Sequence, residues 1–290
     1  MGTQDRFRDA FVARGENARV SLAGIDPDDT GGIKRKKAEN ESLVGEETML
    51  EWQMRLWAEK KQSLLVVLQA MDTGGKDGTV KHAMGRLNPM GADVVGFGPP
   101  TPEEARHDFL WRIKKELPNP GEIVIFNRSH YEDVLVARVK GLVPPEVIEK
   151  RYDQINKFEK DLVDHGTTIV KFCLHISYEE QRERLLARLH DPNRRWKFSE
   201  NDIKERAFWD DYWSAYDVAL TRCNTPSAPW YVIPANHKWY RNWVVARILT
   251  EVLKDMNPKY PQVKLDIPAL EKRLKQVPAR PGQPRASRQK

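Results

Sequence analysis

The sequence predicts an α/β protein whose five-stranded parallel sheet is covered by helices on both faces. Five short apolar runs alternate along the chain with segments of helical periodicity, which is the pattern of βαβ units. A glycine-rich turn carrying a lysine joins the first apolar run to the next helix, as in phosphate-binding loops. The length of 290 residues suits one large domain with extensions. In such a sheet, ligands bind at the carboxyl ends of the strands.

The first strand and the turn after it are the most informative part of the chain. Leu64–Leu68 is apolar throughout, as expected of a strand buried on both faces. The match of the turn to GxxxxGK[ST] is imperfect, because Ala70 replaces the first glycine and Asp77 the final hydroxyl residue. We interpret it as a phosphate loop, with an ordinary tight strand-to-helix turn as the alternative. The residues expected to bind phosphate here are Gly74, Gly75, Lys76, Gly78 and Thr79.

The other elements follow from periodicity, turn residues and capping signals. Further strands are predicted at Asp93–Phe97, Ile123–Phe126, Thr167–Ile176 and Trp230–Pro234. Helices are predicted at Glu41–Lys61, from Lys76, at Thr101–Leu117, from Pro145 to His165, at Tyr178–His190, from Ser199 to Thr221 and at Trp239–Met256. We therefore expect an N-terminal arm with little regular structure at 1–41, the phosphate-loop domain at 42–256 and a basic, proline-rich tail at 257–290.

The formal net charge of +6 comes mainly from the tail. Residues 272–290 hold seven Lys or Arg and no acid, so the remainder is near −1 and the tail is expected to be disordered. No apolar run approaches the roughly 20 residues of a membrane span, and no signal peptide is evident. Cys173 and Cys223 form no metal-binding or disulfide pattern. A cytoplasmic protein with a buried Cys173 is expected.

Asp72 and Arg128 are candidate residues of a reaction site. Asp72 lies inside the loop, where a carboxylate would repel phosphate unless a metal ion lay between them or it accepted a proton. A catalytic or metal-linked role is therefore indicated, with capping of the turn as the alternative. Arg128 follows the third strand and could neutralise developing phosphate charge. Its alternative is a structural pair with a carboxylate.

Asn127 stands at the end of the third strand, where many phosphate-loop proteins place an acid that contacts Mg²⁺. An amide adds no charge, so the nearby acids Glu132 and Asp133 could supply it. The metal candidates are therefore Asp72 and Asp133. His130 lies beside aromatic residues and is expected to be structural.

A basic segment around the break at Asp191–Asn193 is the candidate lid. Between residues 182 and 197 there are six Lys or Arg and two acids. Arg188, Arg195 and Lys197 are expected to lie on a segment that hinges over bound phosphates. For Arg184, a solvated helix face is an equal alternative.

Three sequence blocks, in this order, resemble the family-2 polyphosphate kinases. They are MDTGGKDGTV at 71–80, FNRSHYEDVLVARV at 126–139 and RWKFSENDIKERAFWDDYWSAY at 195–216. The similarity extends from about residue 26 to about residue 256. It implies a three-layer α/β/α phosphate-loop kinase fold with a helical lid at about 184–215. It also implies a homo-oligomer, dimer or tetramer, that reversibly transfers a terminal phosphoryl group between inorganic polyphosphate and nucleotides with Mg²⁺, or alternatively Mn²⁺.

The resemblance also implies roles for individual residues. Those implied to be catalytic are Asp72, Lys76 and Arg128, and those implied to face polyphosphate are Arg188, Arg195 and Lys197. The form NRSHYED resembles the subgroup that phosphorylates both AMP and ADP, with Glu132 near the acceptor nucleotide and Asn127 beside it. Many members have Asp where Asn127 stands, so the metal contact would shift towards Asp133.

Two other functions remain open at this level. An ATP-dependent nucleoside monophosphate kinase would share the fold, and ATP supplied with AMP in the absence of polyphosphate distinguishes it. A non-catalytic binder of polyanions or nucleic acid would use the tail and Lys34–Lys37, and its binding would weaken steeply with salt. The loop acid and the basic lid favour the polyphosphate-dependent enzyme, with no specific nucleic-acid partner and no membrane partner.

Overall fold

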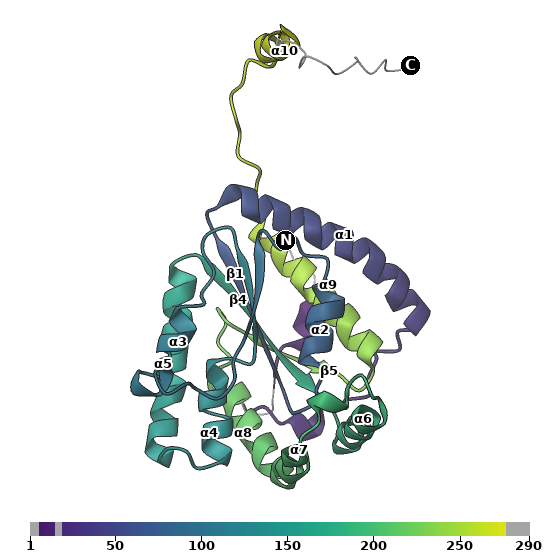
Figure 1. Cartoon of the computed structure of the whole chain (residues 1–290), viewed down its shortest axis with the longest axis vertical. Coiled ribbons are helices and arrows are strands. Elements are labelled where there is room, and N and C mark those ends of the chain that lie inside the picture. The colour runs from purple at the N-terminus through teal and green to yellow at the C-terminus, as the bar shows by residue number, and fades with distance from the viewer. Residues whose placement is uncertain (1–5, 15–18, 277–290) are drawn as a thin grey trace. The chain divides into compact units, whose positions relative to one another are not determined.

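The computed structural model describes residues 6–14 and 19–276, and its centre is a parallel sheet (Figure 1). The strands are β1 (Ser63–Ala70), β2 (Ala92–Gly96), β3 (Ile123–Asn127), β4 (Thr167–His175) and β5 (Trp230–Pro234). Their spatial order is β2-β3-β1-β4-β5, so β1 is central. All neighbouring pairs are parallel. The predicted fold class is confirmed, and each strand lies within two residues of its predicted bounds.

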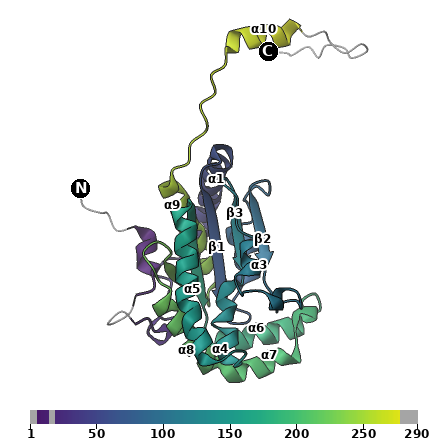
Figure 2. The same ribbon diagram turned by 90° about the vertical axis from the view of Figure 1, so that its left-hand side faces the viewer.

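Helices cover both faces of the sheet. They are α1 (Arg35–Glu59), α2 (Lys76–Ala83), α3 (Trp111–Lys114), α4 (Val136–Val139), α5 (Pro145–Asp164), α6 (Tyr178–His190), α7 (Glu200–Glu205), α8 (Trp209–Arg222) and α9 (Lys238–Met256). Short 3₁₀ turns are η1 (Phe7–Phe11), η3 (Leu22–Gly24), η4 (Glu104–Arg106), η5 (His130–Asp133), η6 (Arg195–Lys197) and η7 (Arg206–Phe208). Figures 1 and 2 show α1, α2 and α9 on one face and α3, α4, α5 and α8 on the other.

The central strand explains why the sheet is buried on both sides. Successive side chains of a strand point to opposite faces. Leu65 and Val67 join the core beneath α5 and α8, whereas Leu64, Val66 and Leu68 join the core beneath α1 and α9. All five side chains are at most 1% exposed. The continuous apolar run in the sequence therefore reflects two cores that share one strand.

The N-terminal segment is largely irregular, but it packs along the edge strand β5. Val12 forms an antiparallel bridge with Tyr231, and the N–H of Ala13 donates to the Trp230 carbonyl at 2.8 Å. This contact covers backbone groups that an edge strand would otherwise expose. The first long helix starts at Arg35 rather than at the predicted Glu41, so the last residues of the predicted arm are helical.

The prediction of one helix over Thr101–Leu117 is wrong. Its start signal forms a reciprocal cap, because the Thr101 N–H donates to Glu104 at 2.8 Å and the Glu104 N–H to the Thr101 hydroxyl at 3.2 Å. Only the turn η4 follows, and the chain turns again at Asp108, whose carboxylate accepts from the Leu110 N–H at 3.0 Å. Side-chain acceptors of this kind compete with helical hydrogen bonds. The short α3 then begins at Trp111.

The helix expected from Ser199 to Thr221 is divided into α7 and α8 by the turn η7. The helix expected from Lys76 begins there and ends at Ala83. The segment from Tyr260 onward forms a separate unit containing α10 (Ile267–Gln276), so the predicted tail is helical in part. Its basic end at 277–290 lies outside the described residues. No helix among the described residues is long and apolar enough to cross a bilayer. Cys173 is buried, as predicted.

Candidate active site

The parallel sheet brings two loops together at its carboxyl edge. Leu68 of β1 lies opposite Asn127 of β3, and the N–H of Arg128 donates to the Leu68 carbonyl at 3.1 Å. The loop after β1 and the segment after β3 are therefore neighbours, as the general rule for α/β sheets predicts. This register places Asp72 within reach of Arg128, although the two are 56 positions apart in the chain.

The glycines of the loop are required by its backbone and by its neighbours. Gly75 has a φ of +101°, which residues with side chains rarely adopt. A Cβ on Gly74 would lie 2.4 Å from the Cβ of Ala70. Lys76 begins α2 directly after this turn and donates from Nζ to the Ala70 carbonyl at 2.9 Å. The strand, turn, lysine and helix thus have the arrangement of a phosphate-binding loop.

Lys76 has an unusually low pKa for a lysine. Burial, followed by the positive charge of Arg128, lowers its pKa from 10.5 to about 8, against the opposing effect of Asp72. Among the described residues, no carboxylate lies within ion-pair distance of its ammonium. A cation that is partly desolvated and unpaired will bind a phosphate oxygen strongly, because the anion restores the lost solvation.

Asp72, Arg128 and Glu132 form a connected cluster beside the loop. Nη2 of Arg128 donates to Oδ1 of Asp72 at 3.0 Å, and its Nη1 donates to Oε2 of Glu132 at 3.1 Å. Glu132 also accepts from Nε2 of Gln69 at 3.0 Å. Arg128 has a φ of +68°, which is uncommon for a residue with a side chain and typical of functional sites. The structural pair considered for Arg128 therefore exists, and it lies inside the candidate site.

A buried polar network holds the turn η5, which carries Glu132 of this cluster. Nζ of Lys171 donates to Glu159 at 2.5 Å, to the Tyr131 hydroxyl at 2.9 Å and to the Cys223 carbonyl at 2.7 Å. Tyr131 and His130 both reach Oε1 of Glu159, at 2.8 and 3.2 Å. Burial raises the pKa of Glu159, but Lys171 and His130 reverse this and hold the pKa below its usual value. The network fixes the turn η5, and His130 is structural as expected.

Asp77 and Asn127 connect the loop to the segment predicted to form a lid. Nδ2 of Asn127 donates to Oδ1 of Asp77 at 2.9 Å, and Nζ of Lys197 pairs with Oδ2 of the same carboxylate at 2.7 Å. The hydrogen bond from Lys197, followed by that from Asn127, lowers the pKa of Asp77. The residue that breaks the phosphate-loop consensus therefore holds a lid lysine in this structure.

The lid cations lie around η6 and the end of α6. Nη1 of Arg188 donates to the Lys197 carbonyl at 3.1 Å and lies 3.4 Å from Asp202. Arg195 is exposed and donates to the Leu189 carbonyl at 2.9 Å. Of the three predicted lid residues, only Lys197 reaches the loop in this arrangement.

Arg184 lies behind the loop and is not on a solvated face. It is 9% exposed, pairs with Glu180 at 2.6 Å and donates to the Thr73 carbonyl at 3.0 Å. Gln181 lies about one turn earlier in α6, and its Nε2 donates to the Asp72 carbonyl at 3.0 Å. Sequence reasoning missed this role for α6 in shaping the loop, and residue type alone gave no signal for Gln181.

Two predicted site residues are engaged elsewhere. The N–H and the hydroxyl of Thr79 both donate to the Gly75 carbonyl, at 2.9 and 3.1 Å, so neither donor is free for phosphate. Asp133 lies 3.4 Å from Arg151 of α5, and burial, partly offset by Arg151, raises its pKa. Among the described residues, no three His, Cys, Asp or Glu side chains are grouped to hold a metal ion.

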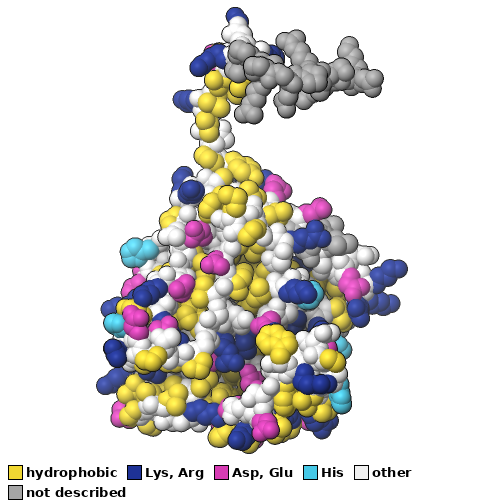
Figure 3. All heavy atoms as spheres, viewed as in Figure 1, with side chains coloured by type: hydrophobic (Ala, Val, Ile, Leu, Met, Phe, Trp, Pro, Cys, Tyr) yellow, Lys and Arg dark blue, Asp and Glu magenta, His cyan; other side chains and the backbone are white. Residues whose placement is uncertain are grey.

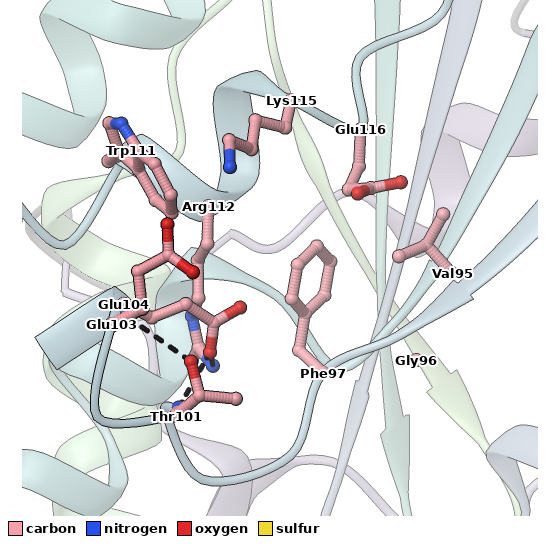
Figure 4. A pocket seen from close by; sticks show the side chains of 10 residues that line it. All are labelled: Val95, Gly96, Phe97, Thr101, Glu103, Glu104, Trp111, Arg112, Lys115 and Glu116. Atoms are coloured by element: carbon pink, nitrogen blue, oxygen red, sulfur yellow. Dashed lines mark hydrogen bonds and ion pairs between the residues drawn. The ribbon is translucent and has the colours of Figure 1, made fainter.

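A hollow of about 260 Å³ opens beside the end of β2 (Figure 4). It adjoins the site because the N–H of Phe97 donates to the Asn127 carbonyl at 3.1 Å. Arg112 crosses its floor and donates to the Gly98 carbonyl at 2.8 Å, with Glu104 3.7 Å away. The lining residues are Val95, Gly96, Phe97, Thr101, Glu103, Glu104, Trp111, Arg112, Lys115 and Glu116. In the same view as Figure 1, Figure 3 shows Lys and Arg side chains spread over this face and interspersed with Asp and Glu.

A comparison with known protein families identifies the family to which this chain belongs. The sequence model of the family described as "Polyphosphate kinase 2" matches residues 32–261, which is most of the chain. The chain belongs to the Polyphosphate kinase 2 family.

Relatives within this family agree in sequence and in structure. The chain is 52% identical over 248 residues to an AMP/ADP-polyphosphate phosphotransferase of Meiothermus ruber, covering 85% of this chain and 93% of that one. It is 39% identical over 243 residues to an ADP-polyphosphate phosphotransferase of Rhodopseudomonas palustris, covering 80% and 83%. The crystal structure of Polyphosphate Kinase 2 from Arthrobacter aurescens has a TM-score of 0.85 and 42% identity, covering 91% and 97%.

Proposed function

We propose that this polyphosphate kinase transfers the terminal phosphoryl group of inorganic polyphosphate to ADP, and also to AMP, in a reversible reaction. The supporting observation is the cluster of Asp72, Arg128 and Glu132 beside a phosphate loop whose Lys76 has no carboxylate partner among the described residues. A loop that only held a nucleotide would gain nothing from an acid at position 72. The 52% identity to an AMP/ADP-polyphosphate phosphotransferase supports both acceptors.

In the proposed step, a terminal phosphate oxygen of the nucleotide forms a bond to the last phosphorus of polyphosphate. The bond from that phosphorus to the next bridging oxygen breaks, and the shortened polyphosphate leaves with the electron pair. Such transfers require positioning and neutralisation of charge rather than a protein nucleophile. Lys76 and Arg128 would bind the oxygens of the transferred group, and Glu132 would orient Arg128 through their 3.1 Å bond.

Asp72 fits the needs of a Mg²⁺ ion that is shared with phosphates. Its carboxylate is half-buried, and among the described residues only its Oδ1 is bonded, to Arg128, which leaves Oδ2 available. Mg²⁺ is commonly held by one or two carboxylates together with substrate phosphates and water. The bound ion would neutralise charge on the phosphate oxygens. Asp133 as a second ligand stays a prediction, since Arg151 holds it in this structure.

The nucleoside of the acceptor is proposed to lie in the hollow beside β2. The hollow adjoins Asn127, and the Phe97 ring points into it (Figure 4). The Trp111 ring is covered by His107 at 4.0 Å and Lys115 at 3.4 Å. The Phe97 ring is 7% exposed, packs edge-on against Phe126 at 4.9 Å and has the Arg112 guanidinium 5.5 Å away, so its exposed edge is the part available to a base. Phe97→Leu keeps an apolar side chain but removes the aromatic ring, and it should raise the KM for ADP roughly fivefold, with the KM for polyphosphate unchanged. An unchanged KM for ADP would exclude this placement.

The decisive assay supplies purified protein with ADP, long-chain polyphosphate and Mg²⁺ and measures ATP by luciferase. The wild-type protein should form ATP, and Asp72→Asn should reduce the rate at least about a hundredfold while its circular dichroism spectrum stays unchanged. Asp161→Asn, on the exposed surface of α5, is the matched control and should retain full activity. No turnover by the wild-type protein with any nucleotide would refute the proposal.

The same assay tests the alternative function, that of an ATP-dependent nucleoside monophosphate kinase. ATP supplied with AMP, in the absence of polyphosphate, should yield no ADP if polyphosphate is the required phosphoryl carrier. Rapid ADP formation would favour a nucleoside monophosphate kinase. A dimer or tetramer in the cytoplasm stays a prediction, and light scattering of the purified chain measures its oligomeric state.

A further inference from the structure

The first turn of α9 breaks a general rule of helix composition. A helix N-terminus carries partial positive charge and favours acidic side chains. The 19-residue helix α9 instead begins with Lys238 and has Arg241 three residues later, with no acid in its first turn. Violations of local rules concentrate where function requires them. This helix end would gain from an anion that the chain itself does not supply.

Arg241 is buried against the phosphate loop. It is 2% exposed, and a Cβ on Gly75 would lie 1.9 Å from its Nη1. A Cβ on Gly78 would lie 3.1 Å from its Nη2. The guanidinium therefore occupies the space that side chains at these two loop positions would fill, and the glycines let it approach the loop backbone directly.

The guanidinium of Arg241 has no anionic partner among the described residues. Nε and Nη2 donate to the neutral Oδ1 of Asn242, at 3.1 and 2.8 Å, and Nη1 makes no hydrogen bond with any described residue. Burial, followed by the charge of Arg184, lowers the pKa of Arg241 to about 10. Buried charges are normally paired, so an unpaired one at a ligand-binding loop indicates that a ligand completes it.

The charged residues near Arg241 do not supply it with an anionic partner. Arg184 is already neutralised by Glu180 at 2.6 Å, and its remaining donors reach backbone carbonyls. Lys238 is exposed, and burial together with Arg184 lowers its pKa. Glu180 opposes this effect on the pKa of Lys238, whereas Arg194 and Arg241 add to it.

This positive region is distinct from the reaction cluster. The charges that act on Lys76 are those of Arg128, Asp72, Glu132 and Asp77. Those that act on Lys238 come instead from residues of α6, α9 and the lid. The charged groups that act on Lys238 therefore differ from those that act on Lys76.

We propose that Arg241 and Lys238 form a second phosphate subsite, which binds phosphoryl groups of the polyphosphate chain away from the reacting end. The inference rests on the proposed function, because polyphosphate is its ligand. Arg241 packs against Gly75 and Gly78, the glycines on either side of Lys76 in the sequence. Nucleotide acceptors do not need the subsite, so it contributes to donor affinity and to preference for longer chains.

The test compares steady-state kinetics of variants with three substrates: long-chain polyphosphate, tripolyphosphate and ADP. Lys238→Gln should raise the KM for long-chain polyphosphate about fivefold. Arg241→Met should raise it more than about tenfold, and Arg241→Lys should recover most of the loss. The KM for ADP should stay constant, and that for tripolyphosphate should change less. Lys254→Gln, at the other end of α9, is the matched control and should behave as wild type.

Several outcomes would contradict the proposal of a second phosphate subsite. Unchanged KM values in Lys238→Gln and Arg241→Met, or equal increases for ADP and polyphosphate, would show that these residues only support the fold. Because Arg241 is buried, its Met variant is checked by thermal denaturation, and Lys238→Gln decides the question if that variant does not fold. An inactive wild-type protein would instead refute the proposed function, so the two failures are distinguishable.

Discussion

Replacing Lys76 with methionine should increase the stability of the fold while removing its activity. The lysine has a pKa of about 8 instead of 10.5, because burial and Arg128 disfavour its charged form. This difference corresponds to about 3 kcal/mol of destabilisation at neutral pH. Methionine keeps the aliphatic stem but leaves the Ala70 carbonyl without its 2.9 Å donor, a loss of about 1 kcal/mol. A net gain of about 2 kcal/mol would raise Tm by about 5 °C.

The pH dependence of unfolding tests this reasoning directly. Between pH 8 and 10.5 the unfolded chain binds more protons at this lysine than the folded chain does, so wild-type stability should rise through that window. Below pH 8 the penalty is fully present. The free energy of unfolding, measured in urea from pH 7 to 10, should therefore increase more steeply for the wild type than for Lys76→Met. Equal slopes, or a variant less stable than wild type at pH 7, would refute the argument.

The same lysine should make polyphosphate binding depend on pH. A bound phosphate oxygen favours the charged form of Lys76 and raises its pKa, so binding takes up a proton above pH 8. The KM for polyphosphate should therefore increase between pH 8 and pH 9 in the wild type. Lys76→Met should show at least about a hundredfold lower activity at pH 7 despite its higher Tm. A variant with appreciable activity would show that Lys76 does not bind the transferred group.

Three further predictions follow from other contacts. Asp72→Asn should raise the Mg²⁺ concentration required for half-maximal rate as well as lower kcat, and an unchanged Mg²⁺ titration would argue against a metal-linked role. Asp77→Asn breaks the 2.7 Å ion pair to Lys197 and should lower the KM for polyphosphate by up to about fivefold, whereas a higher KM would contradict competition between Asp77 and the donor. Lys171→Met leaves the buried Glu159 without its lysine partner and should destabilise the protein by about 3–5 kcal/mol, as measured by urea unfolding.

The sheet and its functional edge could be predicted because they depend on local patterns and one general rule. An apolar run such as Leu64–Leu68 identifies a buried strand from the sequence alone. Parallel pairing then brings residues after different strands to the same edge, and Asp72 and Arg128 meet there at 3.0 Å. The helix prediction at 101–117 was wrong, although the predicted cap at Thr101 does form. A cap fixes only the first turn and does not determine how far the helix continues. The chain turns again at Asp108, whose carboxylate accepts a hydrogen bond from the Leu110 N–H. Helical periodicity in the sequence gives no sign of such a local hydrogen bond.

The electrostatic surroundings of the loop could not be read from the sequence for a different reason. Arg241 lies far beyond Gly75 in the chain, and only the packing of α9 against α2 brings them together. A signal was present, since basic residues replaced acids at the start of α9. That signal shows an unusual helix end but does not identify the loop it contacts. Likewise, the sequence indicated Lys197 as part of a basic segment, but its partner Asp77 emerged only from the fold.

The balance of charge around the loop indicates which contacts set donor affinity. Arg128, Arg184 and Lys197 each lie within 3.0 Å of a carboxylate of this chain, so an incoming phosphate must share or replace that partner. Such an exchange of one anion for another yields little net free energy. Lys76 and Arg241 have no carboxylate within ion-pair distance among the described residues, and both have lowered pKa values. Each therefore gains a full partner when phosphate binds. We therefore expect these two cations to contribute most to polyphosphate affinity, and we expect the paired cations to act mainly in orienting the donor.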